Sequence, residues 1–210
     1  MKSFASISKN KVIPIENALM FVAGIAGIVS FNQPVFAHHP MDARAPETFN
    51  LIEGFISGLA HPIIGIDHFL FLFSIGLLAT LSFRRWVPLL LVAGMLGTLL
   101  SMILPNFILQ IEIFTGASLI FASLALLERV TPYLMLPLIM LHGYVLGQSI
   151  LGAEPTPLIT YFLGLLLSEI FIILLGTLMI DYFKKSKLIF SGILSVAGGL
   201  CTYFAVSGMI

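Results

Sequence analysis

Long apolar runs separated by short polar connections dominate this chain, and they leave few folds open to it. Five of the runs are each about one bilayer long. They occupy residues 87–104, 107–127, 133–151, 158–180 and 188–209. Because 59% of the 210 residues are hydrophobic and only 10% are charged, a water-soluble globular domain is excluded. We predict an all-α, polytopic membrane helix bundle.

The apolar run over 49–83 is too long to be one membrane span. As a single helix its roughly 35 residues would extend about 52 Å, whereas the hydrocarbon core of a bilayer is about 30 Å thick. Pro62 lacks a backbone N–H and disfavours helical torsions at His61, and Gly65 follows closely. We therefore predict a break within 60–65.

The break divides this run into a half-helix over 49–60 and a first full span over 63–81. Together with the five later runs, it gives six transmembrane helices. Backbone groups freed at a break within lipid must be satisfied by protein or by a water-filled cavity. The break is therefore where we expect a polar site.

Residues 1–37 are typical of a secretory signal peptide. Three lysines lie within the first eleven residues, an apolar stretch covers 18–31, and Ala37 ends a segment suited to signal cleavage. We predict cleavage after Ala37, which leaves a single transmembrane domain over 38–210. An uncleaved chain would instead hold seven apolar segments.

The basic residues near the predicted spans fall in alternate connections. They are Arg84, Arg85, Arg129, Lys184, Lys185 and Lys187. The positive-inside rule places these connections in the cytoplasm, so both ends of a six-span mature chain lie outside. An exported N-terminus requires the same orientation. We predict a multi-pass protein of the bacterial plasma membrane with both termini in the periplasm.

Composition also limits the partners and the chemistry. Ten basic and ten acidic residues give no net charge, so no nucleic-acid partner is expected. The single cysteine, Cys201, forms neither an internal disulfide nor a cysteine cluster, so a metal would be held by nitrogen and oxygen. No nucleotide-binding loop and no H-E-x-x-H motif occurs, and we expect neither an enzyme nor a permanently bound cofactor.

Three ionisable residues gather at the predicted break: His61, Asp67 and His68. Such groups are costly in lipid unless they bind something or each other. On an unbroken helix the two histidines would stand about 10 Å apart along the axis, but a break lets them converge. Two imidazoles and a carboxylate suit Ni(II), Co(II) or Zn(II). The alternative is that each histidine caps a backbone carbonyl and Asp67 pairs with a basic neighbour.

Other candidate ligands lie elsewhere in the chain. Glu112 is near the external start of its span, while His142 and Glu169 are midway in later spans. His142 and Glu169 are candidates for a deeper second site or for passing a proton, and His142 has the alternative of a hydrogen bond to a neighbouring helix. Signal cleavage would leave His38 and His39 at the new N-terminus, either as a metal chelator or as an ordinary polar start.

The motif His61-Pro62-x-x-Gly65-x-Asp67-His68 resembles the signature of the HupE/UreJ family of small nickel and cobalt permeases. The resemblance covers essentially the whole mature chain. Glu112, followed by Gly116-Ala117-Ser118, is similar to a second family pattern, and 141–147 is similar to a third. The resemblance implies that the metal-handling residues are His61, Asp67, His68, Glu112 and His142.

Two departures from the family pattern lie in the third motif. Leu146 stands where a second histidine is usual, and Ser149 stands where an acid is usual. Our first hypothesis is a secondary permease that imports Ni2+, or Co2+, driven by the membrane potential. The departures motivate the alternative of a non-transporting accessory or assembly protein with a metal-binding site. The sequence leaves open whether copies of the chain, or a larger membrane complex, are partners besides the metal ion and the bilayer.

Overall fold

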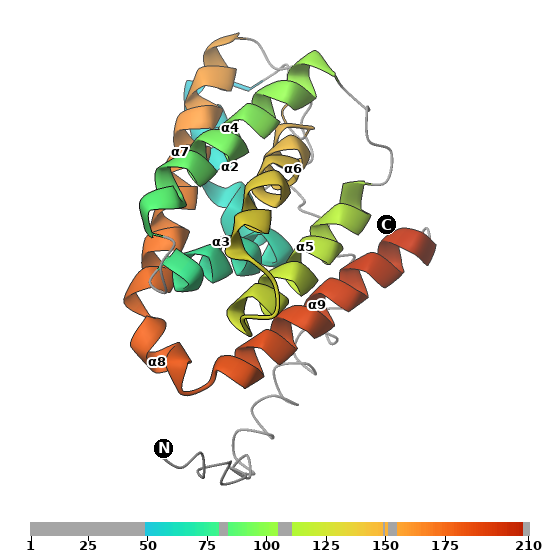
Figure 1. Ribbon diagram of the computed structural model, residues 1–210. Helices are drawn as coiled ribbons and strands as arrows, with labels where there is room; N and C mark the ends of the chain where they lie inside the picture. The colour runs from blue at the N-terminus through green and yellow to red at the C-terminus, as the bar shows by residue number, and fades with distance from the viewer. Residues whose placement is uncertain (1–48, 80–83, 105–110, 149, 151–154, 208–210) are drawn as a thin grey trace, which may run out of the picture. The chain divides into compact units, whose positions relative to one another are not determined.

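In the computed structural model, the described residues are 49–79, 84–104, 111–148, 150 and 155–207 (Figure 1). They belong to one compact unit, Gln33–Ile210. Their helices are α2 (Leu51–Ile64), α3 (Ile66–Leu78), η3 (Arg84–Trp86), α4 (Val87–Ile103), α5 (Ile111–Leu126), η4 (Pro132–Leu134), α6 (Met135–Gln148), α7 (Pro155–Leu178), α8 (Ile180–Lys184) and α9 (Lys187–Ser207). The all-α prediction is confirmed for this part of the chain. The predicted signal peptide lies outside the described residues, as do His38 and His39.

The lengths of the helices support a helical membrane protein. Among the described residues, α7 and α9 are each long and apolar enough to cross a membrane. The pair α2 and α3 qualifies as one further span only when taken together, and it is bent by 77°. Helices α4 and α5 are apolar but shorter.

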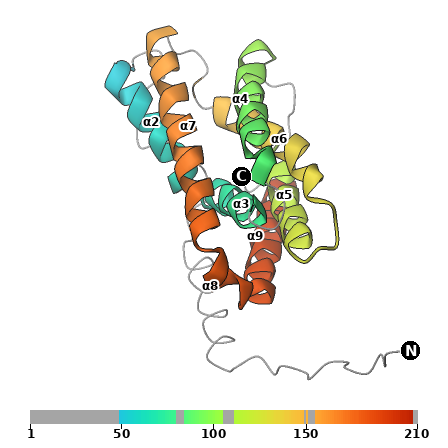
Figure 2. The same cartoon turned by 60° about the vertical axis from the view of Figure 1, so that its left-hand side comes forward.

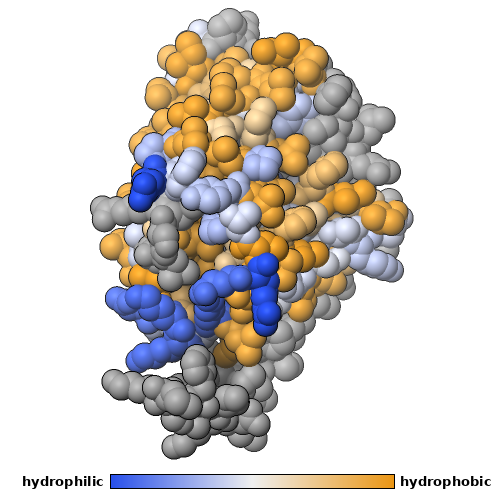
Figure 3. All heavy atoms as spheres, viewed as in Figure 1, coloured by the Kyte–Doolittle hydropathy of each residue, from blue (hydrophilic) through white to orange (hydrophobic). Residues whose placement is uncertain are grey.

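The outer surface carries apolar stripes, the reverse of a water-soluble protein. On α7 the exposed side chains recur every three or four residues: Ile159, Leu163, Leu167, Phe171, Leu174 and Leu178. The exposed stripe of α4 has the same spacing: Leu89, Val92, Leu96, Leu99 and Ile103. In a soluble helix such a stripe would face the core. Figure 3 shows one face that is hydrophobic over most of its area, with its hydrophilic side chains concentrated in the lower half.

Helix α3 is the centre of the unit. Its residues from Phe71 to Leu78 are all buried, so every face of the helix is covered. Figures 1 and 2 show it lying across the other helices, and it packs against α2, α5, α7 and α9. A helix that is apolar all round is expected in such a buried position.

The break between α2 and α3 falls at Gly65, within the predicted range. The prediction that His61 leaves the helix is wrong, because α2 continues through Pro62 to Ile64. Pro62 lies in the last turn, where its missing N–H costs a single helical hydrogen bond. The N–H of Gly65 donates to the carbonyl of His61 at 3.0 Å, and the carbonyl of Gly65 accepts from Phe69 at 2.8 Å. Gly65 thus ends one helix and begins the next.

Glycines set the distances between paired helices. In four pairs a Cβ on a glycine would overlap the backbone carbonyl of the partner helix. The contacts are Gly58 with Tyr161 (α2 and α7), Gly76 with Ile173 (α3 and α7), Gly97 with Met140 (α4 and α6) and Gly198 with Gly116 (α5 and α9). Small residues let membrane helices approach this closely.

The predicted basic connections meet at one end of the unit. The amine of Lys187 donates to Glu128 at 2.7 Å, and the Trp86 ring lies edge-on to Tyr133 with centroids 5.0 Å apart. The hydrogen bond and the charge of Lys187 lower the pKa of Glu128. This pair therefore stabilises the folded chain at neutral pH, and the stabilisation is lost as the pH falls through that lowered pKa.

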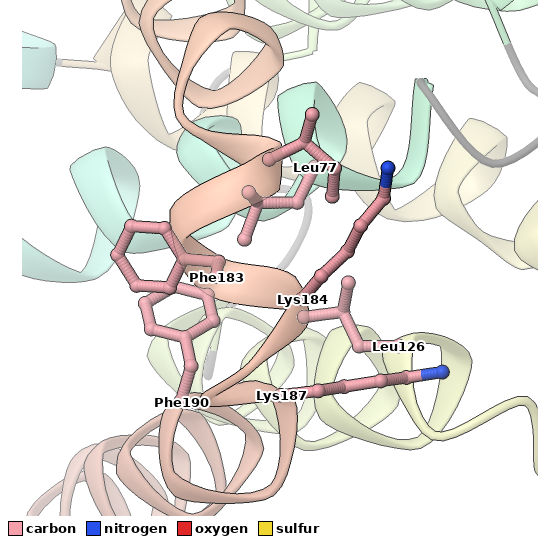
Figure 4. Close-up of a pocket in the computed structure, with 7 residues that line it drawn as sticks. Leu77, Leu126, Phe183, Lys184, Lys187 and Phe190 are labelled. Atoms are coloured by element: carbon pink, nitrogen blue, oxygen red, sulfur yellow. The ribbon is translucent and has the colours of Figure 1, made fainter.

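A small cavity of about 100 Å³ lies at this end. Its walls come from five apolar residues and two lysines: Leu77, Leu126, Ile180, Phe183, Phe190, Lys184 and Lys187. Figure 4 shows the two lysine side chains extending to the same side, away from the phenylalanines. Lys184 donates to Asp181 at 2.9 Å, so the lysine stems cover apolar surface while their amines stay paired.

The glycine contacts predict a difference between two alanine substitutions. Gly97→Ala places a methyl group against the carbonyl of Met140 and should destabilise the bundle by about 1–3 kcal/mol. Gly199→Ala is the matched control, because nothing lies within 4 Å of the added atom. Thermal unfolding in detergent micelles measures both. Equal melting temperatures would show that α4 and α6 are not packed through Gly97.

A second prediction concerns Glu128, which has a φ of 59°. The N–H of Arg129 donates to Leu124 and that of Glu128 to Ala125, a helix end at which glycine is usual. Glu128→Gly and Glu128→Ala both lose the bond to Lys187, but only glycine accepts this torsion freely. The glycine variant should be more stable than the alanine variant by about 1 kcal/mol in chemical denaturation. The same stability in both variants would contradict this account.

Candidate metal centre

The bend at Gly65 brings together two histidines that the sequence separates. The ring of His61, in the last turn of α2, stacks on the ring of His68, in the first turn of α3, with centroids 5.7 Å apart and planes inclined by 24°. On a continuous helix they would be about 10 Å apart along the axis. The predicted convergence is therefore seen.

A third imidazole completes a column. The ring of His142, from α6, lies 5.2 Å from that of His68 at an angle of 74°. The candidate second site at His142 is therefore joined to the first, because α3 crosses the unit and brings His68 to α6. The ring of Phe71, also from α3, stacks on that of His142 with centroids 4.0 Å apart. We call His61, His68 and His142 the histidine column; all three are buried.

Hydrogen bonds determine which nitrogen of His142 carries the proton. Its Nδ1 lies 3.3 Å from the carbonyl oxygen of Leu138 and 3.4 Å from the hydroxyl of Ser118. A carbonyl only accepts, and the Ser118 hydroxyl already donates to Thr115, so Nδ1 must be the donor. The lone pair is then on Nε2, which is buried without a hydrogen-bond partner among the described residues. This is the form of imidazole that binds transition metals.

Asp67 provides the charged and more accessible end of the cluster. Its Oδ2 is 3.6 Å from Nδ1 of His68, and its side chain is 14% exposed, against 2% for His68. Oδ1 of Asp67 and Nδ1 of His68 have no hydrogen-bond partner within the described chain. Asp67 lies in the first turn of α3, where the helix dipole stabilises a negative charge.

The distances between neighbouring ring centroids in the column can be compared with those of two imidazoles bound to one metal ion. With metal–nitrogen bonds of about 2 Å, two imidazoles on one ion have centroids roughly 5 Å apart. The two neighbouring separations are close to this value. Within the described residues, however, no group of three His, Cys, Asp or Glu side chains already converges on one point.

The remaining predicted ligands divide into two groups. Glu112 is the second residue of α5, but its side chain is outside the described residues, as are His38 and His39. Glu169 is buried on α7 and is not among the contacts of the column. The alternative of a hydrogen bond from His142 to a neighbouring helix holds in part. Nδ1 lies within hydrogen-bond distance of Ser118 on α5, whereas Nε2 has no hydrogen-bond partner among the described residues.

Three residues near the cluster were not among the candidate ligands of the sequence analysis. Two of them could have been found from the sequence. Phe71 lies one helical turn after His68 and so shares its face, and Ser118 belongs to the same motif as Glu112. Cys201 of α9 is close enough to interact electrostatically with Asp67. Only the tertiary structure joins these two residues.

Leu146, which stands where the family pattern has a second histidine, lies in apolar surroundings. Leu146 is 2% exposed and packs in a cluster with Ile150, Tyr161 and Leu165. Its carbonyl accepts from the Tyr161 hydroxyl at 2.7 Å. The turn of α6 after His142 therefore supplies packing rather than a ligand. Ser149 lies outside the described residues.

A comparison with protein families gives a match over most of the chain. A family model described as HupE / UreJ protein matches residues 26–208, which includes all three motif segments. No curated protein and no solved structure matches the chain.

The order of the column predicts unequal losses of metal binding. His68 lies between the other two rings and beside Asp67, so His68→Ala should weaken cobalt binding by at least about tenfold. His61→Ala and His142→Ala each remove only one end and should have smaller effects. The measurement is titration of purified protein with Co2+, followed by its absorption bands. Glu128→Gln, a surface acid outside the column, is the control. Unchanged affinity in His68→Ala would remove the column as the binding site.

Proposed function

Because this chain belongs to the HupE/UreJ protein family, we propose that it is a secondary permease that imports a divalent transition metal, Ni2+ or Co2+, across the bacterial plasma membrane. The observation that carries the proposal is the buried imidazole column, in which Nε2 of His142 keeps an unused lone pair. Ionisable groups buried in a membrane protein are expensive unless they bind a substrate or each other.

The proposed topology has six spans with the basic end in the cytoplasm. Two observations support it: the contact of Trp86 with Tyr133, and the bond from Lys187 to Glu128, which gather the basic connections at one end. The positive-inside rule assigns that end to the cytoplasm. Residues 1–37 are then a cleaved signal peptide, and the mature termini lie in the periplasm.

In the proposed mechanism the ion enters at Asp67, the accessible group of the cluster. It passes to His68 and from there to His61 or His142, with Glu112 near the entrance and His38 and His39 as first captors. Two ligands at a time hold the ion loosely, which suits a carrier, because a site that binds too tightly does not release. The membrane potential drives a divalent cation inward with about 4.6 kcal/mol per 100 mV.

A second candidate is a non-transporting accessory protein that holds metal beside a larger membrane complex. The burial of Leu146 in an apolar cluster, where the family usually has a ligand, favours it. Such a protein would bind cobalt but move none. Transport and binding must therefore be measured on the same preparation.

Uptake into liposomes tests the proposal. Vesicles that contain the purified protein, with an inside-negative potassium diffusion potential, should accumulate radioactive nickel or cobalt above protein-free vesicles. Uptake should fall when the potential is removed, because the field acts directly on the charge of the ion. His68→Ala should lower the initial rate by at least about tenfold.

Gly199→Ala is the matched control for this assay, since the substitution meets open space and should transport like the parent chain. Metal binding without uptake above protein-free vesicles would reject the permease and favour the accessory protein. Neither binding nor uptake would reject both.

A further inference from the structure

Glu169 of α7 is a buried acid that the histidine column does not use. Its side chain is 1% exposed, and its Oε2 has no hydrogen-bond partner among the described residues. A Cβ added to Gly94 of α4 would lie 3.4 Å from Oε1 and 3.5 Å from Ile139 of α6. The carboxyl group therefore lies where α4, α6 and α7 meet.

No positive charge accompanies this carboxyl group in the described part of the chain. Glu169 takes part in none of the ion pairs found there, and α4 has no ionisable side chain from Val87 to Ile103. The ionisable groups on α2, α3, α6 and α8 are Glu53, His61, Asp67, His68, His142, Tyr144, Asp181, Tyr182 and Lys184. Lys184, the only permanent cation in this set, is bonded to Asp181.

A carboxylate without a counter-ion is unstable in such surroundings. Transfer of an isolated charge from water to an apolar interior is so costly that the group takes up a proton instead. A lone carboxyl group also lacks the further ligands that a divalent cation needs, since no group of three ligating side chains occurs among the described residues. Glu169 is thus suited to hold a proton rather than the metal.

One close helix contact separates Glu169 from the histidine column. Gly143, which follows His142, lies against the carbonyl of Gly94, and Gly94 lies against the carboxyl group of Glu169. Neither glycine adds a side chain to this path. Both His142 and Glu169 are buried, so a positive charge that arrives at His142 acts on Glu169 through a region of low dielectric, where electrostatic effects are strong.

We propose that Glu169 is a proton-exchange site coupled to the histidine column, an inference that rests on the proposed transport function. With the column empty, the carboxyl group holds a proton. When a divalent cation enters the column, the O–H bond of Glu169 breaks, the proton passes to water, and the carboxylate remains as a counter-charge. After the cation leaves, the carboxylate takes a proton from water again.

Proton release on metal binding tests this role. Purified protein in weakly buffered detergent solution, with a pH indicator dye, is titrated with CoCl2 while the cobalt absorption bands report occupancy of the column. The parent chain should release about one proton per bound ion more than Glu169→Gln. Ser168→Ala, a buried neighbour without an acid, is the matched control and should release protons like the parent.

The two readouts separate the failure of this inference from that of the proposed function. Cobalt bands in both proteins with equal proton release would overturn the role of Glu169 and leave the permease intact. An absence of cobalt bands in the parent chain would overturn the metal site itself, and the coupling with it.

Infrared difference spectroscopy covers the case in which Glu169→Gln does not fold. The carbonyl stretching band of a protonated carboxylic acid should be lost when Co2+ is added to the parent chain. Glu169→Asp keeps the acid and should show the same loss at a shifted frequency. A parent spectrum without such a change would overturn the proposal without any glutamine variant.

Discussion

The bend of 77° at Gly65 is the constraint on which the rest of the structure depends. It turns α3 out of the direction of α2 and lays it across the unit, where all of its faces are covered. Two consequences follow. His61 and His68, which belong to opposite sides of the bend, come within ring contact, and His68 also reaches His142 on a helix distant in sequence. Without the bend the three imidazoles would belong to three separate environments.

A helix can lie across its neighbours only if they pack closely around it. Lipid supplies no hydrophobic force between helices, so their association depends on dense packing and on hydrogen bonds. Glycines provide the packing: Gly76 and Gly176 let α3 and α7 touch through their backbones, and Gly97 and Gly143 do the same for α4 and α6. Four buried hydroxyls bond to carbonyls of their own helix, which satisfies them without separating the helices: those of Ser74, Thr98, Ser101 and Ser118.

Much of this arrangement could be predicted from the sequence, and the exceptions have physical causes. Apolar runs located the helices, and Pro62 with Gly65 indicated a break within a few residues of its position. The proline was overrated, because in a last turn it costs only one hydrogen bond and His61 stays helical. The separate depth assigned to His142 assumed parallel spans, whereas α3 crosses them. No local pattern could bring His68 to His142, or Glu169 to Gly94, because these contacts exist only after the helices pack.

Charge explains why one acid of this interior, Glu169, lies apart from the neutral imidazoles. The histidine column contributes ligand atoms but no negative charge, so a divalent cation held there needs compensation from elsewhere. Asp67 supplies one carboxylate at the accessible end, and on the proposed mechanism Glu169 supplies a second only while the ion is present. Two carboxylates equal the charge of the ion. An acid that is neutral at rest spares the empty protein a buried charge, and an acid outside the coordination sphere adds no ligand that would slow release. Weak binding and charge compensation can therefore coexist, which is what a carrier requires.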